Sequence, residues 1–96
     1  MNPKYNHYKI TLEHTFSPKE EDLNPAVVLE FDNHDEIFAI ITRLQEKNHF
    51  DDADQSAQFA IGLKIFSEVM LKNKNNNLFS EFLPEFKNFM TKLKSN

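Results

Sequence analysis

Hydrophobic and polar residues alternate along two stretches near the N-terminus, "YKITLEH" and "AVVLEFD". A repeat of two residues is typical of a half-buried β-strand, with one side apolar and the other polar. The residues of the apolar side are Tyr8, Ile10, Leu12, Val27, Leu29 and Phe31. We therefore predict strands over about residues 5–14 and 26–32. Because sequential strands usually pair, they should form an antiparallel hairpin, joined by the solvated loop "TFSPKEEDLNP".

The repeat changes to that of a helix after the second strand. On a helical wheel, the apolar residues of "NHDEIFAIITRLQEKN" fall within an arc of roughly 160°, and they are Ile37, Phe38, Ile40, Ile41 and Leu44. This pattern predicts an amphipathic helix over about residues 34–48. Asn33 and Glu36 have the spacing of a capping box, in which each side chain bonds to the other residue's backbone N–H.

A second helix is predicted over about residues 52–72. Asp51 or Asp52 can cap its start, and "NKNNN" ends it, because asparagine tolerates the left-handed backbone geometry common at helix C-termini. Its apolar residues cover an arc of roughly 200°, with Ser67, Lys64 and Glu68 on the remainder. We expect this helix to be the buried central element, packed against the sheet and both other helices.

The chain's only glycine, Gly62, lies near the centre of that apolar arc. A glycine inside a helix costs about 1 kcal/mol relative to alanine. Its position favours the close approach of another segment of backbone, for which the missing side chain leaves room. The alternative is a tolerated defect with no packing role.

A third helix is predicted over about residues 84–94, since Pro84 suits an early helical position. Its apolar stripe consists of Phe86, Phe89, Met90 and Leu93. A short turn at "LFSEF" should precede it. The whole pattern predicts an α+β fold in which a two-stranded antiparallel hairpin is followed by three helices packed on one face, within a single domain of residues 1–96.

Composition and charge exclude several classes of function. The net charge is −4, with nine acidic and five basic residues in the first half, and the only arginine is Arg43. Nucleic-acid binding needs clustered basic residues, so we expect no nucleic-acid partner. The absence of cysteine excludes disulfides, thiol nucleophiles and Cys-rich zinc sites. A single glycine excludes phosphate-binding loops and the nucleophile elbow. The apolar pattern predicts no membrane span or leader, and we expect a cytoplasmic protein.

The four histidines raise the question of a metal or acid–base site. His34 and His49 bracket the first helix and should lie about 22 Å apart. Antiparallel pairing places His7 near Asp32, His34 and Asp35, a combination that suits a divalent metal or an acid–base pair. The simpler interpretation is an ordinary helix start with acids that complement the helix dipole. We therefore predict no catalytic, cofactor or metal residues.

Two other groups of residues have both a functional and a structural interpretation. The acidic run Glu20 to Asp22 can dock a basic partner, although such loops are mostly solvated. The phenylalanines of the last segment lie near Lys87, Lys92 and Lys94, a combination that suits a membrane-surface or partner-binding helix. They are Phe79, Phe82, Phe86 and Phe89. Because a small protein needs large side chains in its core, the core interpretation is favoured, and we expect no membrane partner.

The segment "LEFDNHDEIFAII", followed by "FAIGLKIFSEVMLKNKNNNLFSEFLPEFKNFMTKLK", resembles domain-of-unknown-function family 3861, an uncharacterised bacterial family. The likeness covers nearly the whole chain and is most specific in "GLKIFSEVMLK" and "FMTKLK". The resemblance implies a small single-domain bacterial protein. It implies no activity, cofactor or catalytic residue.

The sequence favours a non-catalytic protein-interaction module over an enzyme. A two-stranded sheet has two open edges and is marginal alone, and the second helix has surplus apolar surface. Both features favour a homodimer and leave room for another protein partner. The alternatives are a metal-dependent or small-molecule activity centred on His7, Asp32 and His34, and a helical nucleic-acid binder, which the charge disfavours.

Overall fold

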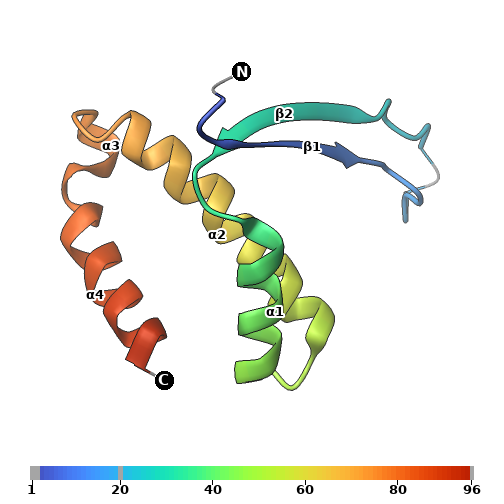
Figure 1. The fold of residues 1–96 in the computed structure, drawn as a ribbon. Coiled ribbons are helices and arrows are strands. Elements are labelled where there is room, and N and C mark those ends of the chain that lie inside the picture. The colour runs from blue at the N-terminus through green and yellow to red at the C-terminus, as the bar shows by residue number, and fades with distance from the viewer. Residues whose placement is uncertain (1–2, 20, 96) are drawn as a thin grey trace. The chain divides into compact units, whose positions relative to one another are not determined.

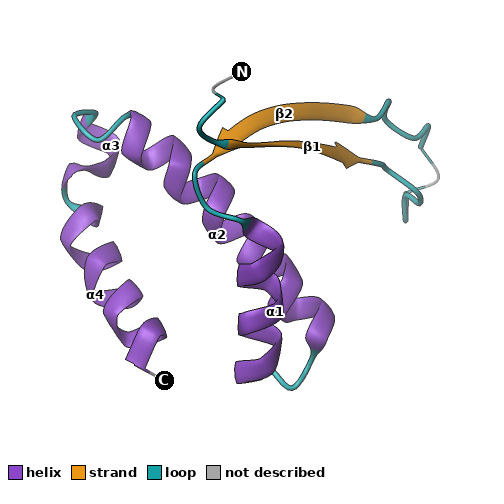
Figure 2. Ribbon diagram, in the orientation of Figure 1, coloured by secondary structure: helices purple, strands orange, loops and turns teal. Residues whose placement is uncertain are grey.

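The computed structural model describes residues 3–19 and 21–95, so Glu20 of the acidic run lies outside the described residues. Two strands are followed by helices (Figures 1 and 2), in the order β1 (Asn6–Leu12), β2 (Val27–Asn33), α1 (Ile37–Lys47), α2 (Ala53–Lys72), α3 (Asn77–Ser80) and α4 (Phe82–Ser95). This order confirms the predicted α+β class. The chain divides into two compact units, Met1–Glu36 and Ile37–Asn96. That the helices cover one face of the sheet, and that they form a single domain with it, stay predictions.

The first unit is the predicted hairpin. β1 and β2 pair antiparallel, with Ile10 opposite Leu29 and Leu12 opposite Val27. Side chains alternate between the two faces of a strand, so the six predicted apolar residues share one face, and His7, Lys9 and their partners share the other. Towards the loop the apolar face is open, because Leu12 is 71%, Val27 48% and Leu29 53% exposed.

The chain leaves β2 through a network of hydrogen bonds around Asp35. The buried Asn33 accepts a bond on its Oδ1 from the Asp35 N–H at 2.9 Å. The Asp35 carbonyl accepts one from Asn6 Nδ2 at 3.2 Å and one from the Tyr8 hydroxyl at 3.1 Å. The prediction that Asn33 bonds to the N–H three residues on is therefore wrong. Its side chain closes a turn two residues long, and α1 begins only at Ile37.

A short turn joins α1 to α2, and its geometry is specified by polar side chains. Asn48 and Asp51 have positive φ angles of 56° and 53°, a backbone region that these residue types tolerate. Asn48 Nδ2 donates to Asp51 Oδ1 at 2.9 Å. Asp52 caps α2, as predicted, by accepting a bond from the Gln55 N–H at 3.0 Å. α1 and α2 consequently run side by side in opposite directions (Figure 1).

The buried face of α2 overlaps the predicted apolar arc only at Met70. Its buried residues are Ser56, Ala60, Ser67 and Met70, whereas Phe66 is 43% and Val69 49% exposed. Three of the four buried residues are small, and small side chains let a neighbouring helix approach closely. The prediction of a helix buried around its wide apolar arc is therefore wrong. The buried stripe of α2 is small and partly polar, and much of its bulky apolar surface is open to solvent.

α2 ends at Lys72, as the asparagine run predicts, but by a different geometry. Asn73 has φ −122°, so the left-handed conformation is not used there. The Asn73 backbone N–H donates to the Met70 carbonyl at 3.1 Å, and its side-chain Nδ2 donates to the Val69 carbonyl at 2.8 Å. The side chain and backbone together satisfy two carbonyl groups of the last turn.

The segment after α2 forms two helices where a turn and one helix were expected. Asn76 caps the four-residue α3 by accepting a bond from the Leu78 N–H at 2.9 Å. α4 begins at Phe82, two residues before the predicted start, so Pro84 still occupies an early position that needs no backbone donor. None of the helices within the described residues combines the length and hydrophobicity that crossing a membrane requires.

Phenylalanine rings join α4 and α3 to α2. Phe66 of α2 meets three rings edge-on, those of Phe79, Phe82 and Phe86, at centroid distances of 6.3, 5.9 and 6.3 Å. Nearer the start of α2, Phe59 meets Phe89 at 6.2 Å. These distances are typical of favourable aromatic pairs. The rings thus contact one another within the helical unit, but they are not fully buried, because Phe82 is 42% and Phe89 45% exposed.

Gly62 lies between Phe59 and Phe66 on α2, and a Cβ atom placed on it would meet nothing within 4 Å. The interpretation that another backbone passes close to this glycine is therefore wrong for the described chain. We predict that Gly62→Ala raises the free energy of unfolding by up to about 1 kcal/mol, because alanine has the higher helix propensity. Urea denaturation measures the change, and Gln58→Gly gives the size of the propensity effect at an exposed position of the same helix. A loss of stability in Gly62→Ala contradicts the prediction.

Met70 is the largest fully buried side chain, with no exposed surface, while its neighbour Leu71 is 51% exposed. We predict that Met70→Ala lowers the free energy of unfolding by about 2–5 kcal/mol, because it removes buried apolar surface and leaves a cavity. Leu71→Ala should change it by less than about 0.5 kcal/mol. Denaturant unfolding of the two variants measures both changes. Equal losses of unfolding free energy would contradict the conclusion that the face of α2 with Met70 is the buried one.

Candidate functional site

The hairpin brings together two of the three residues of the predicted histidine site. His7 lies directly opposite Asp32 in the sheet register. Its Nδ1 is 2.6 Å from Asp32 Oδ1, and its Nε2 is 3.2 Å from Glu30 Oε1. The two acids are two residues apart on β2, so they point to the same face as the imidazole. The His7 side chain is 30% exposed and that of Asp32 25%.

His34, the third residue of that prediction, makes different contacts. Its Nε2 is 3.4 Å from Asp35 Oδ1, and its ring lies 5.9 Å from that of Tyr5. Over residues 3–19 and 21–95, no group of three or more His, Asp and Glu side chains is arranged to hold a metal ion. The structure thus forms two separate histidine–carboxylate pairs from the residues that the sequence groups together.

The geometry of His7 determines what this cluster can do. Hydrogen bonds to Asp32 and, second, to Glu30 raise the pKa of His7 above its ordinary value of 6.5. When the ring is protonated, it donates one N–H to each carboxylate, and these contacts tie β1 to β2.

His14 has a similar structural role at the other end of the hairpin. Its Nδ1 accepts hydrogen bonds from both the backbone N–H and the side-chain Nδ2 of Asn24, each at 3.0 Å. These bonds join the two ends of the loop between β1 and β2. With Leu12, Pro25 and Val27, the two residues border a cavity of about 340 Å³.

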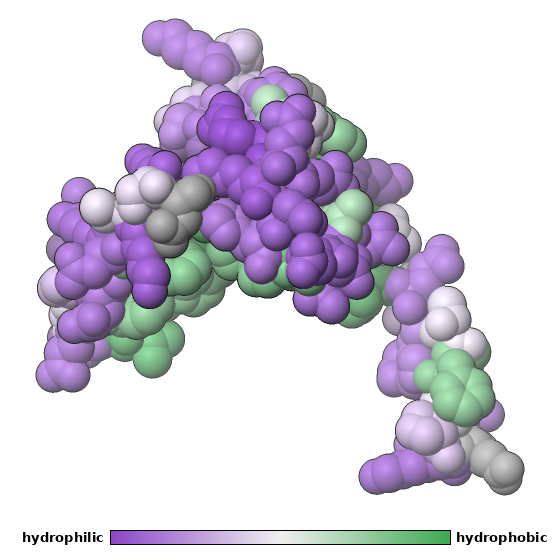
Figure 3. Space-filling view, turned by 90° about the horizontal axis from the view of Figure 1, so that it is seen from below, coloured by the Kyte–Doolittle hydropathy of each residue, from purple (hydrophilic) through white to green (hydrophobic). Residues whose placement is uncertain are grey.

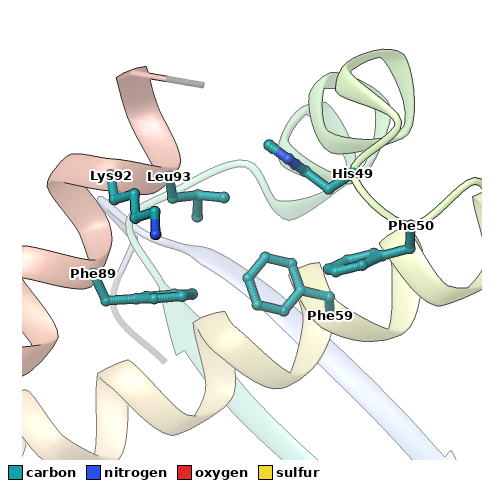
Figure 4. A pocket seen from close by; sticks show the side chains of 6 residues that line it. All are labelled: His49, Phe50, Phe59, Phe89, Lys92 and Leu93. Carbon is teal, nitrogen blue, oxygen red and sulfur yellow. The ribbon is translucent and has the colours of Figure 1, made fainter.

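The helical unit contains a larger cleft that the sequence did not predict as a site. It has a volume of about 450 Å³ and is lined by His49, Phe50, Phe59, Phe89, Lys92 and Leu93. Figure 4 shows these side chains converging from three segments: the turn between α1 and α2, the first half of α2, and the last turns of α4. We call it the aromatic cleft.

Each wall of the aromatic cleft is positioned by contacts within the helical unit. The hydrogen-bonded turn between Asn48 and Asp52 carries His49 and Phe50, and the Phe50 ring meets Phe59 edge-on at 5.4 Å. The last turn of α4 is held by Lys47 of α1, whose Nζ donates to the carbonyls of Leu93 at 3.1 Å and Lys94 at 3.3 Å. A lysine at a helix C-terminus also complements the negative end of the helix dipole.

Sequence reasoning found only part of this cleft. It marked Phe89 and Lys92 as members of a helix suited to a partner, but gave no role to His49 or Phe50. Those two residues follow a helix end and have no periodic pattern. A signal does exist in "NHFDD", where asparagine and aspartate side chains specify a tight turn that fixes the direction of the residues between them.

The raised pKa of His7 predicts how stability depends on pH. Below the ordinary pKa of 6.5 the imidazolium's bonds to Asp32 and Glu30 contribute fully to stability, and the contribution is lost as the pH rises through the raised pKa of the folded protein. We predict that the melting temperature of the wild type falls as the pH rises from 6.5 through the raised pKa of His7. The melting temperature of His7→Gln should fall less over the same range. Melting curves at several pH values measure this, with His49→Gln as the control that keeps the wild-type dependence. Equal pH dependence in wild type and His7→Gln would refute it.

Comparisons with known proteins identify the family and support the fold. The profile of domain-of-unknown-function family 3861 (DUF3861), which has a solved structure, matches residues 6–95. A protein of unknown function from Pectobacterium atrosepticum SCRI1043, with a crystal structure at 2.20 Å, is similar with a TM-score of 0.83. The two sequences are 32% identical over 96% of this chain and 99% of that one. The comparison with curated proteins found no match. The chain therefore belongs to domain-of-unknown-function family 3861, as its resemblance implied.

Proposed function

We propose that this protein is a non-catalytic, cytoplasmic interaction module that self-associates. One observation carries the proposal: among the described residues, four hydrophobic residues are buried while fifteen large hydrophobic side chains are at least 42% exposed. The buried four are Ile37, Leu44, Ala60 and Met70. A core of this size offsets little of the conformational entropy lost on folding a chain of 96 residues. Association would bury further apolar surface and stabilise the folded chain.

The hairpin supplies one of the surfaces for this association. Leu12, Val27 and Leu29 are neighbours on its apolar face and are about half exposed or more. A two-stranded hairpin is marginally stable by itself, and apolar side chains from another molecule would stabilise it. The hydrogen-bonding edges of β1 and β2 are also open within the described sheet.

A second copy of the chain has a surface that suits this face. Residues 1–36 contain eight acidic and three basic residues, so two hairpins would repel each other, whereas residues 37–96 contain seven acidic and eight basic residues. The end of α2 and α3 expose the apolar residues Phe66, Val69 and Leu78. Hydrophobic side chains, drawn in green, are also visible on the surface in the space-filling view (Figure 3). We therefore propose that the hairpin of one copy packs on the helical unit of another, reciprocally in a dimer.

Two adjacent valines on β2 provide a matched test. Val27 is 48% exposed on the apolar face, and Val28 is 51% exposed on the opposite face. We predict that the wild type is a dimer in sedimentation velocity over a dilution series, and that Val27→Lys shifts it towards monomer, because a charge on the apolar face must be desolvated. Val28→Lys should remain as dimeric as the wild type.

Circular dichroism of both variants shows whether the fold is kept. A wild type that sediments as a monomer at every concentration contradicts the self-association. A dimer that Val27→Lys and Val28→Lys weaken equally contradicts the assignment of the apolar face.

A further inference from the structure

We propose that the aromatic cleft of the helical unit binds a small aromatic carboxylic acid. The proposal concerns the cleft lined by Phe59, Phe89, Lys92 and the turn residues, and it does not depend on self-association. It rests on three properties of the cleft: its apolar walls, the position of a cation, and its size.

The walls are suited to a flat aromatic group. Phe50, Phe59 and Phe89 form a chain of edge-to-face pairs, with interplanar angles of 80° and 81°. Phe50 is still 43% and Phe89 45% exposed, so these rings keep large surfaces in contact with solvent. A bound ring would replace that solvent and continue the aromatic packing. Leu93 adds an aliphatic surface on the side of α4.

The positive charge of Lys92 in the lining of the cleft favours a negatively charged ligand. The Lys92 side chain ends beside Leu93 and Phe89, on the α4 side of the cleft (Figure 4). Within the described part of the chain, the ion pairs involve other residues and none is formed by Lys92. Among residues 3–19 and 21–95, no acidic side chain lines the cleft. A carboxylate beside Lys92 would therefore gain an ion pair without displacing one, and His49 offers a second polar contact.

The size of the cleft fits a ligand of this class. Its volume of about 450 Å³ lies within the range of small-molecule sites, which is about 300–1,000 Å³. The hydrogen bonds from Lys47 to the end of α4 and the capped turn before α2 hold its two sides. A site whose walls are already positioned loses little entropy on binding, which favours a small rigid ligand.

Titration of the full-length protein with 2-naphthoate tests the proposal, and the neutral alcohol 2-naphthalenemethanol serves as the uncharged probe. We expect naphthoate to shift the backbone amide signals of Phe50, Phe59 and Phe89 in ¹H–¹⁵N spectra. Lys92→Ala should weaken naphthoate binding about two- to fivefold, the range expected for a partly exposed ion pair. Lys92→Arg should restore it.

Lys87→Ala is the matched control, because Lys87 is an exposed lysine of the same helix that does not line the cleft. It should bind naphthoate as the wild type does, and Lys92→Ala should leave the binding of the alcohol unchanged. The proposal is overturned if naphthoate shifts no signal of the cleft residues. It is also overturned if the alcohol binds as tightly as the acid, or if Lys92→Ala and Lys87→Ala have the same effect.

Discussion

The way α4 is held to α2 determines most of what the helical unit exposes. The two helices meet through phenylalanine rings, with Phe59 against Phe89 at one position and Phe66 against Phe86 at another. Long aromatic side chains keep the backbones apart, whereas small residues let them approach. Gly62 lies between these two bridges and contributes no side chain, so nothing fills the space around it. An open aromatic surface is the consequence, and the cleft lies at one end of it.

The sequence predicted the elements well because their signals are local. Alternation marked the two strands, and an aspartate or asparagine marked each end of α2, where the side chain bonds to the backbone within four residues. The buried face of α2 could not be predicted in this way. The hydrophobic pattern predicted that the side of α2 with Phe66 and Val69 is buried. The residues that are buried include Ser56, Ala60 and Ser67. The distance between packed helices depends on which small residues face each other, and one helix's pattern does not contain that information.

The two candidate sites also differ in how far the sequence alone predicts them. His7 and Asp32 were predicted as neighbours because antiparallel register relates positions on two strands by simple counting, and the pair is found at 2.6 Å. The aromatic cleft needs a contact between Lys47 and the carbonyl of Leu93, 46 residues apart in sequence. It also requires that the turn with two positive φ angles orients the Phe50 side chain. Neither requirement produces a periodic pattern of residues, so only the folded chain shows which side chains converge.

The His7 cluster and the apolar face of the hairpin depend on one another. Side chains alternate between the two faces of a sheet, so a slip of one residue in the pairing turns every side chain to the opposite face. Such a slip would separate His7 from Asp32 and Glu30, which it now meets through both ring nitrogens. It would also turn Val27 and Leu29 away from the side on which Leu12 lies. The contacts of His7 on the polar face therefore favour the one register in which the apolar residues form a continuous surface.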